Sequence, residues 1–138
     1  MRQFTAVAAL LALAFEVACT ATPLTLPGPI LGLDDKAGTR KAVLEGMAVR
    51  GWVVEEEVGT RVLARMDRRS HVAKVWIDYT GKQIEFSYGG SRGLECDQEG
   101  DSCRSIHRNY NRWVRNLALD ISRKVTERRA VQEAPSAA

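Results

Sequence analysis

The segment 71–79 constrains the fold more than any other part of the sequence, because its side chains alternate in character at every second position. Alternate side chains of an extended chain point to opposite faces, so this spacing predicts a strand with one face against a core. The predicted core face holds His71, Ala73, Val75, Ile77 and Tyr79. Similar alternation recurs at 62–66 and 84–88, and a further strand is expected at 52–57. Short connections predict antiparallel pairing, and the glycine-rich residues 89–93 are expected to end the sheet.

Two amphipathic segments flank these strands and are predicted to be helices. The first follows Asp34 or Asp35, either of which can cap its amide donors, and ends at Gly51. Its expected buried face is Ala37, Leu44, Met47 and Ala48. The second has Ser105 as its expected cap, and its apolar positions recur at intervals of three or four. These positions are Ile106, Tyr110, Trp113, Val114, Leu117, Ile121 and Val125.

A sheet with one apolar face is closed most simply by placing both amphipathic helices on that face. The sequence therefore predicts an α+β fold of order α-β-β-β-α, with two helices packed on one face of an antiparallel three- to four-stranded sheet. We place this single domain at 34–128. The chain has 138 residues, of which 45% are hydrophobic and 27% charged, and this length and composition suit one globular domain.

Residues 1–18 are typical of a signal peptide that is removed on export. Arg2 supplies the positive start, and an apolar run from Ala6 to Phe15 follows it. That run is too short to cross a membrane as a helix, which takes about 20 residues. A buried N-terminal helix is the alternative interpretation. A removed peptide predicts that the domain lies in the periplasm, where disulfides form.

Cys19 is the expected site of lipidation. The sequence Glu-Val-Ala-Cys at 16–19 resembles a bacterial lipobox, in which the cysteine becomes the acylated first residue, although Glu16 replaces the usual apolar side chain. Cysteine parity favours the same interpretation, because pairing of Cys96 with Cys103 leaves Cys19 alone. The sequence therefore predicts a protein held by its lipid to the bacterial membrane.

Thr20, in place of an aspartate after the cysteine, resembles the sorting pattern of outer-membrane lipoproteins. Ordinary cleavage after Ala21, which would give a soluble periplasmic protein, is the alternative. Residues 19–33 contain three prolines and two glycines and are predicted to be a flexible tether. Residues 129–138 are small and polar and are predicted to be a disordered tail.

Five segments carry a shared sequence pattern: Arg50-Gly51-Trp52, Gly59-Thr60, Val62-Leu63-Ala64, the strand segment 71–79, and residues 106–117 with the pattern IHxxYNxWVxxL. Together they resemble a family of small envelope lipoproteins of Gram-negative bacteria. In members of that family, the residues that correspond to Tyr88 and the positions after it resemble the pattern Tyr-x-Asp-Ser-x-Asn-Leu. This chain departs from them there, with Gly90, Ser91, Gly93 and Leu94. The resemblance implies the fold and an envelope location, and it implies no activity.

Cys96 and Cys103 are expected to form a disulfide in an oxidising compartment. The closed loop of eight residues would contribute about 2.5 kcal/mol on the chain-entropy estimate. Six intervening residues do not fit a redox-active C-x-x-C pair. The loop also alternates Asp97, Glu99 and Asp101 like a calcium loop, but Ser102 and Arg108 stand where such a loop needs glycine and glutamate. We therefore predict a structural disulfide and no calcium site.

No enzyme motif is found in the sequence. It contains no GxSxG, HExxH or phosphate-cradling glycine loop, so no catalytic residue and no cofactor are assigned. The two histidines, His71 and His107, are too few for a zinc site, and no metal is expected. His71 on an apolar strand face is more often a hydrogen-bonded core residue than a catalyst. We therefore favour a non-catalytic role.

The last predicted helix carries the most informative surface. On a helical wheel Arg104, Arg108, Arg112, Arg115 and Arg123 fall within an arc of about 100° opposite the apolar stripe. Leu119 projects into the middle of that arc, as the centre of a contact surface would. The alternative is a solvated face that the acidic residues at 55–57 and 97–101 neutralise.

These observations predict a lipid-anchored periplasmic domain that binds other envelope components without catalysis. Arg108, Arg112, Arg115, Leu119 and Arg123 are the expected binding residues. The expected partner is anionic lipid, lipopolysaccharide or an acidic envelope protein, and nucleic acid is excluded by the compartment. The alternative is a small ligand-binding or hydrolytic module with a helix–sheet groove, in which His71 and Tyr79 lie near the mouth.

Overall fold

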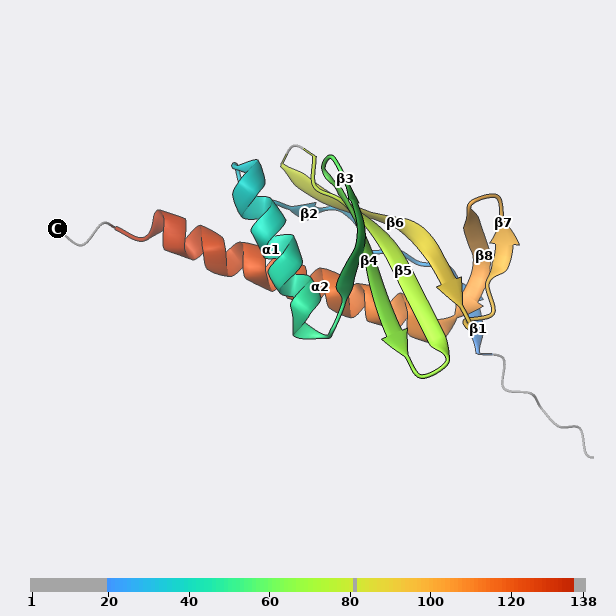
Figure 1. The fold of residues 1–138 in the computed structure, drawn as a ribbon. Helices are drawn as coiled ribbons and strands as arrows, with labels where there is room; N and C mark the ends of the chain where they lie inside the picture. The colour runs from blue at the N-terminus through green and yellow to red at the C-terminus, as the bar shows by residue number, and fades with distance from the viewer. Residues whose placement is uncertain (1–19, 81, 136–138) are drawn as a thin grey trace, which may run out of the picture.

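The computed structural model describes residues 20–80 and 82–135, which form two antiparallel sheets and two helices (Figure 1). In chain order these are β1 (Ala21–Pro23), β2 (Ile30–Leu31), α1 (Lys36–Val49), β3 (Val53–Val58), β4 (Arg61–Arg68), β5 (His71–Asp78), β6 (Gln83–Arg92), β7 (Asp97–Glu99), β8 (Ser102–His107) and α2 (Arg108–Glu133). The predicted signal peptide at 1–18 and the predicted lipidation of Cys19 lie outside the described residues.

The α+β class and the antiparallel pairing are confirmed, but the sheet is larger than expected. Five strands pair in the order β2-β6-β5-β4-β3, and a second sheet has the order β1-β8-β7. The α-β-β-β-α order is therefore wrong, because two strands precede α1 and a hairpin, β7–β8, precedes α2. These extra strands are two to six residues long, too short for most of them to display an alternating pattern.

The expected flexible tether is instead part of the folded domain. β1 pairs with β8, so that Ala21 lies opposite His107, and β2 pairs with β6, so that Ile30 lies opposite Ile84. The chain between and after these strands places Leu24, Leu26, Ile30 and Leu33 against the core. Burial of these apolar side chains offsets the entropy lost when a proline- and glycine-rich segment is ordered.

The expected tail boundary is also wrong, because α2 continues to Glu133. Arg129 donates a hydrogen bond from Nη2 to the carbonyl oxygen of Gly32 at 2.7 Å, and Gln132 donates to Asp35 at 3.2 Å. These contacts hold the last turns of α2 against the start of α1. Residues 136–138 of the predicted tail lie outside the described residues.

The N-terminus of α1 agrees with the prediction, but its buried face agrees only at Met47. Asp35 caps the helix by accepting a hydrogen bond from the amide of Gly38 at 2.6 Å. The buried side of α1 is made of smaller residues than expected: Gly38, Thr39, Ala42, Val43, Gly46 and Met47. Ala37 and Ala48 are exposed and Leu44 is half-buried. The small residues are inside because α1 packs closely against α2 where the two helices meet (Figure 1).

The long helix α2 begins two residues later than expected. Ser105 and Ile106 belong to β8, and His107 is the cap, accepting a hydrogen bond from the amide of Asn109 at 3.1 Å. The predicted apolar stripe is otherwise buried, with Trp113 half-buried at its border. α2 passes along the five-stranded sheet and extends beyond it, while the small sheet lies at the helix's first turn (Figure 1).

Tyr110 joins α2 to the centre of the large sheet. Its side chain is fully buried, and its hydroxyl donates to the carbonyl oxygen of Lys74 at 2.7 Å. The β5–β6 register shifts between Lys74 and Val75, where β6 inserts Gly89 as an extra residue. A Cβ atom on Gly89 would lie 2.7 Å from Leu63 Cδ1 and 3.0 Å from the backbone of Lys74 and Val75, so this bulge favours glycine. The glycines at 89 and 90 therefore bend β6, which continues to Arg92. The expectation that residues 89–93 end the sheet is wrong.

We predict that Gly46→Ala destabilises the fold by about 2–3 kcal/mol, as overpacking of a close contact does. A Cβ atom there would lie 2.5 Å from Ile121 Cγ1 and 2.6 Å from Ile121 Cα, so α1 would have to move away from α2. Chemical denaturation measures the loss. Gly28→Ala is the control, because a Cβ atom at Gly28 has no neighbour within 4 Å. Equal stability of the two variants would contradict this packing.

Burial raises the pKa of Tyr110 well above its ordinary value of 10.0, so the folded state keeps this hydroxyl neutral where the unfolded chain ionises. The contribution of Tyr110 to the free energy of unfolding is therefore fully present below pH 10. Above pH 10 it falls by about 1.4 kcal/mol per pH unit. We predict a smaller alkaline loss for Tyr110→Phe than for the wild type in denaturation series from pH 9 to 11. Parallel pH profiles of the two proteins would show that Tyr110 is not the group responsible.

Candidate functional site

The residues predicted to bind form one continuous exposed strip along α2. We call Arg108, Arg112, Arg115, Leu119 and Arg123 the arginine face. All five side chains are exposed, and Leu119 retains 58% of its surface. From Arg108 to Arg123 the helix rises by about 22 Å. The strip lies opposite the buried stripe that packs on the sheet, as the helical wheel predicts.

Arg104, which the wheel placed on the same arc, does not belong to this face. It lies in β8, where a strand replaces the helix expected from Ser105 onward. Its guanidinium lies 3.4 Å from Glu99 and 4.0 Å from Asp97. The acidic residues of the β7–β8 hairpin therefore neutralise Arg104, and no contact of theirs with the arginine face is found in the described chain.

Two of the acidic residues at 55–57, Glu55 and Glu57, also pair away from α2. Glu55 lies 2.8 Å from Lys74 and 2.9 Å from Arg65, and hydrogen bonds from these two residues hold the pKa of Glu55 below its ordinary value. Glu57 pairs with Arg40 at 2.6 Å, and this pair lowers the pKa of Glu57. The carboxylates of Glu55 and Glu57 are thus ionised and form ion pairs with basic side chains of α1, β4 and β5.

Most of the positive charge on the arginine face consequently has no counter-ion. Within residues 20–80 and 82–135, Arg108, Arg112 and Arg115 form no ion pair. Arg123 lies 3.4 Å from Asp120, a buried carboxylate that Arg50 also contacts, at 2.7 Å. Neighbouring guanidinium groups without anions repel one another, so this part of the surface carries unbalanced positive charge.

The start of the described chain lies next to the first residue of the arginine face. The amide of Arg108 donates to the carbonyl oxygen of Thr20 at 2.9 Å, which extends the β1–β8 pairing by one residue. Asn111 holds the same segment by donating to Thr22 at 3.1 Å and to the carbonyl oxygen of Pro23 at 2.8 Å. The path of the chain at Thr20 is therefore fixed relative to α2.

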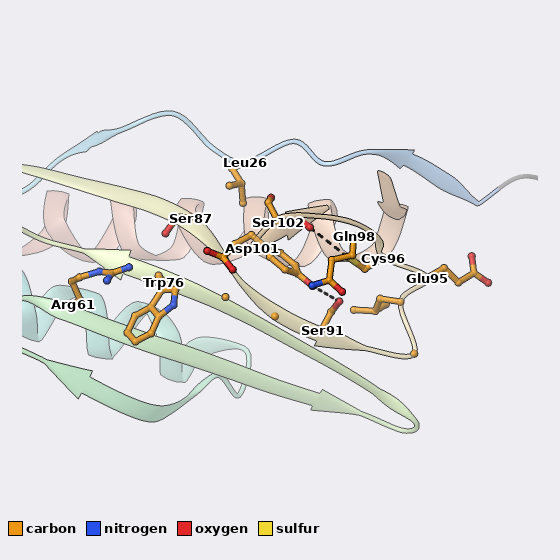
Figure 2. Close-up of a pocket in the computed structure, with 15 residues that line it drawn as sticks. Leu26, Arg61, Trp76, Ser87, Ser91, Glu95, Cys96, Gln98, Asp101 and Ser102 are labelled. Carbon is orange, nitrogen blue, oxygen red and sulfur yellow. Dashed lines mark hydrogen bonds between the residues drawn. The ribbon is translucent and has the colours of Figure 1, made fainter. Parts of the chain in front are cut away.

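A second feature is a groove of about 1060 Å³ between β6 and the β7–β8 hairpin (Figure 2). β2 pairs only with Gln83 and Ile84, so no other described strand pairs with the rest of β6 on this side. Leu26, Trp76 and Arg61 line the groove together with polar residues of β6 and the hairpin. The predicted disulfide between Cys96 and Cys103 is confirmed and ties the hairpin to the segment after β6.

The groove is lined by hydroxyl groups and by the carboxylates of Glu95 and Asp101. Its hydroxyl groups are those of Ser87, Tyr88, Ser91 and Ser102, and Tyr88 and Ser91 hydrogen-bond to each other at 2.7 Å (Figure 2). No histidine lines it, so no imidazole base lies beside these hydroxyls. The sequence did not identify this groove, because its walls come from residues 26, 61, 76 and 87–102, which only the fold brings together.

The histidine and tyrosine of the alternative function do not share a groove. His71 begins β5 and Tyr79 directly follows that strand, so they lie about 26 Å apart along it. His71 Nδ1 lies 2.8 Å from the carbonyl oxygen of Gly93, and the hydroxyl of Tyr79 donates to Glu57 at 3.3 Å. The expectation that both line one helix–sheet groove is therefore wrong.

In the described part of the chain, no helix is long and apolar enough to span a membrane. The same residues contain no group of three or more histidine, cysteine, aspartate or glutamate side chains placed to hold a metal. Comparison with family models, curated proteins and solved structures finds no match to this chain.

We predict that Cys96→Ser/Cys103→Ser lowers the free energy of unfolding by about 2.5 kcal/mol, because the loop of the unfolded chain is then no longer closed. Denaturation of the oxidised wild type, the reduced wild type and the variant measures this. Reduced wild type and variant should agree within about 1 kcal/mol, since both lack the cross-link. Identical stability of the oxidised and reduced wild type would contradict a stabilising role.

Proposed function

We propose that this protein is a non-catalytic domain of the bacterial envelope that docks its arginine face on anionic lipid headgroups and is held there by a lipid on Cys19. One observation carries the proposal: the amide of Arg108 donates a hydrogen bond to the carbonyl oxygen of Thr20, which fixes the chain one residue after Cys19. This point lies at the start of the arginine face, where Arg108, Arg112 and Arg115 have no ion-pair partner among the described residues and Arg123 pairs with Asp120. The resemblance to envelope lipoproteins and the lipobox-like residues 16–19 support the same location.

The anchor and the arginine face would act together. Consecutive Cα atoms are about 3.8 Å apart, so a lipid on Cys19 would hold Arg108 at the surface of the bilayer. A lipid anchor combined with a basic patch binds membranes far more stably than one acyl chain alone. Each arginine or lysine near an anionic surface contributes about 1 kcal/mol. Arg112, Arg115 and Arg123 follow along the same side of α2 and would extend this contact.

The side chains of the face suit phosphate headgroups. A guanidinium donates two parallel hydrogen bonds to a phosphate, which favours arginine over lysine for this contact. Leu119, more than half exposed at the centre of the arginines, would enter the boundary between headgroups and acyl chains. Lipopolysaccharide phosphates offer the same chemistry, whereas an acidic protein partner would not need a lipid surface. Vesicle binding separates these partners.

We predict that Arg112→Glu/Arg115→Glu weakens binding to vesicles containing phosphatidylglycerol by about 30-fold or more, as expected from about 1 kcal/mol per basic residue. Cosedimentation of the full chain measures the affinity. Lys36→Glu/Lys41→Glu is the matched control, because it makes the same change in net charge at exposed positions on α1. It should cost less than about threefold, since salt screens distant charges.

Two results would overturn the proposal. One is equal loss of binding in both double variants, which would mean that only net charge matters. The other is equally tight binding to pure phosphatidylcholine vesicles, which would remove the role of the arginines. Loss of membrane association in Cys19→Ala, with retention in the wild type, tests the anchor separately from the face.

A further inference from the structure

Three turns of the chain meet around a cavity of about 550 Å³ that is separate from the groove of Figure 2. The α1–β3 turn contributes Arg50 and Gly51, and the β4–β5 turn contributes Arg68 and Arg69. The first turns of α2 contribute Asn109 and Trp113, and the wall is completed by Met66, Asp67 and His71. This cavity borders the arginine face but shares none of its residues.

The cavity has positive charge that no acidic residue of its wall neutralises. Arg68 and Arg69 are exposed and form no ion pair with another described residue. Asp67 is the acid in the wall, and both of its carboxylate oxygens lie 3.0–3.2 Å from Arg65. Arg50 contacts the buried Asp120 through Nε, and its side chain remains 46% exposed. Three arginines thus line one open cavity, and two of them, Arg68 and Arg69, have no ion-pair partner among the described residues.

Further hydrogen-bonding groups and an aromatic ring complete the wall. Because the carbonyl oxygen of Gly93 only accepts, His71 must donate to it from Nδ1, and Nε2 is its remaining polar atom. Asn109 adds a side-chain amide, and Trp113 adds a half-buried ring. Such a combination of a few polar groups with an aromatic wall is typical of small-molecule sites.

Arg69 occupies a backbone position that disfavours it. The tight turn between the paired residues Arg68 and His71 holds Arg69 at a φ of 55°, in the left-handed region. Hairpin turns of two residues favour glycine or asparagine in this conformation. A residue kept in a strained conformation points to a role for its side chain. Here that side chain is a guanidinium at the rim of a basic cavity.

We propose that this cavity binds a phosphate group. Paired arginines match the geometry and charge of a phosphate, since each guanidinium can donate two hydrogen bonds to its oxygens. The cavity is larger than one phosphate requires, so the group can be carried by a glycerol or sugar that contacts Trp113. This site does not depend on membrane docking by the arginine face.

The test is calorimetric titration of the full chain with inorganic phosphate in a phosphate-free buffer. Arg68→Gln/Arg69→Gly should weaken binding by about tenfold for each guanidinium removed. Arg69→Gly alone should weaken phosphate binding and also raise Tm, because glycine relieves the left-handed strain. Lys41→Gln, which removes a positive charge on α1, is the control and should leave the affinity unchanged.

The proposal is overturned if inorganic phosphate gives no binding, or if the double variant binds it as tightly as Lys41→Gln. A lower Tm in Arg69→Gly would remove the argument from strain. If vesicle docking fails while phosphate still binds, the cavity stands and the docking proposal alone is lost.

A second titration identifies the source of the phosphate. It uses the chain with Cys19→Ala/Arg112→Glu/Arg115→Glu, which lacks both the anchor and the arginine face, and vesicles that contain phosphatidic acid, a phosphate monoester. If the vesicles bind and inorganic phosphate displaces them, the cavity binds lipid headgroups. Binding of free phosphate alone, with no binding of these vesicles, assigns it to a soluble phosphate compound.

Discussion

The direct passage of the chain from β8 into α2 is the constraint on which the rest of the structure depends. His107 is both the last residue of the strand and the cap of the helix, so no loop separates the two elements. Since α2 packs on the large sheet through a buried stripe, the small sheet is fixed to the large one through the same helix. β1, the groove beside β6 and the entry of the chain at Thr20 take their positions from this junction.

Charge is divided between the two sides of the molecule. Glu55 and Glu57 of β3 pair with cations of α1, β4 and β5, and Asp97 and Glu99 of the β7–β8 hairpin pair with Arg104. The exposed side of α2 and the adjoining basic cavity therefore keep their charge. Asn109 and Trp113 line the cavity from the same helix that presents the arginine face. A phosphate-rich surface could thus contact both, with each contact able to form without the other.

The sequence predicted those helices and strands in which apolar side chains recur at a regular spacing. The strand at 71–79 was predicted from its period of two, and the buried stripe of α2 from its period of three to four. β1 and β2 could not be predicted, because strands of two or three residues carry no period. The predicted buried face of α1 was wrong except at Met47, because a close contact with α2 buries Gly46. The helical pattern follows apolar side chains and gives no signal for a buried glycine. The arginine face followed from the wheel, but the basic cavity did not, since three distant turns form it. Its only signal was a bulky Arg69 where a turn favours glycine.

Docking through the arginine face is tested by NMR of the protein bound to phosphatidylglycerol nanodiscs that contain a spin-labelled lipid. We expect the methyl signals of Leu119 to broaden, because docking would bring that side chain to the lipid surface. Leu31, Val53 and Val58 are also more than half exposed, but they lie on β2 and β3, and their methyl signals should remain sharp. Sharp Leu119 signals together with broadened Val53 and Val58 signals would contradict docking through the arginine face.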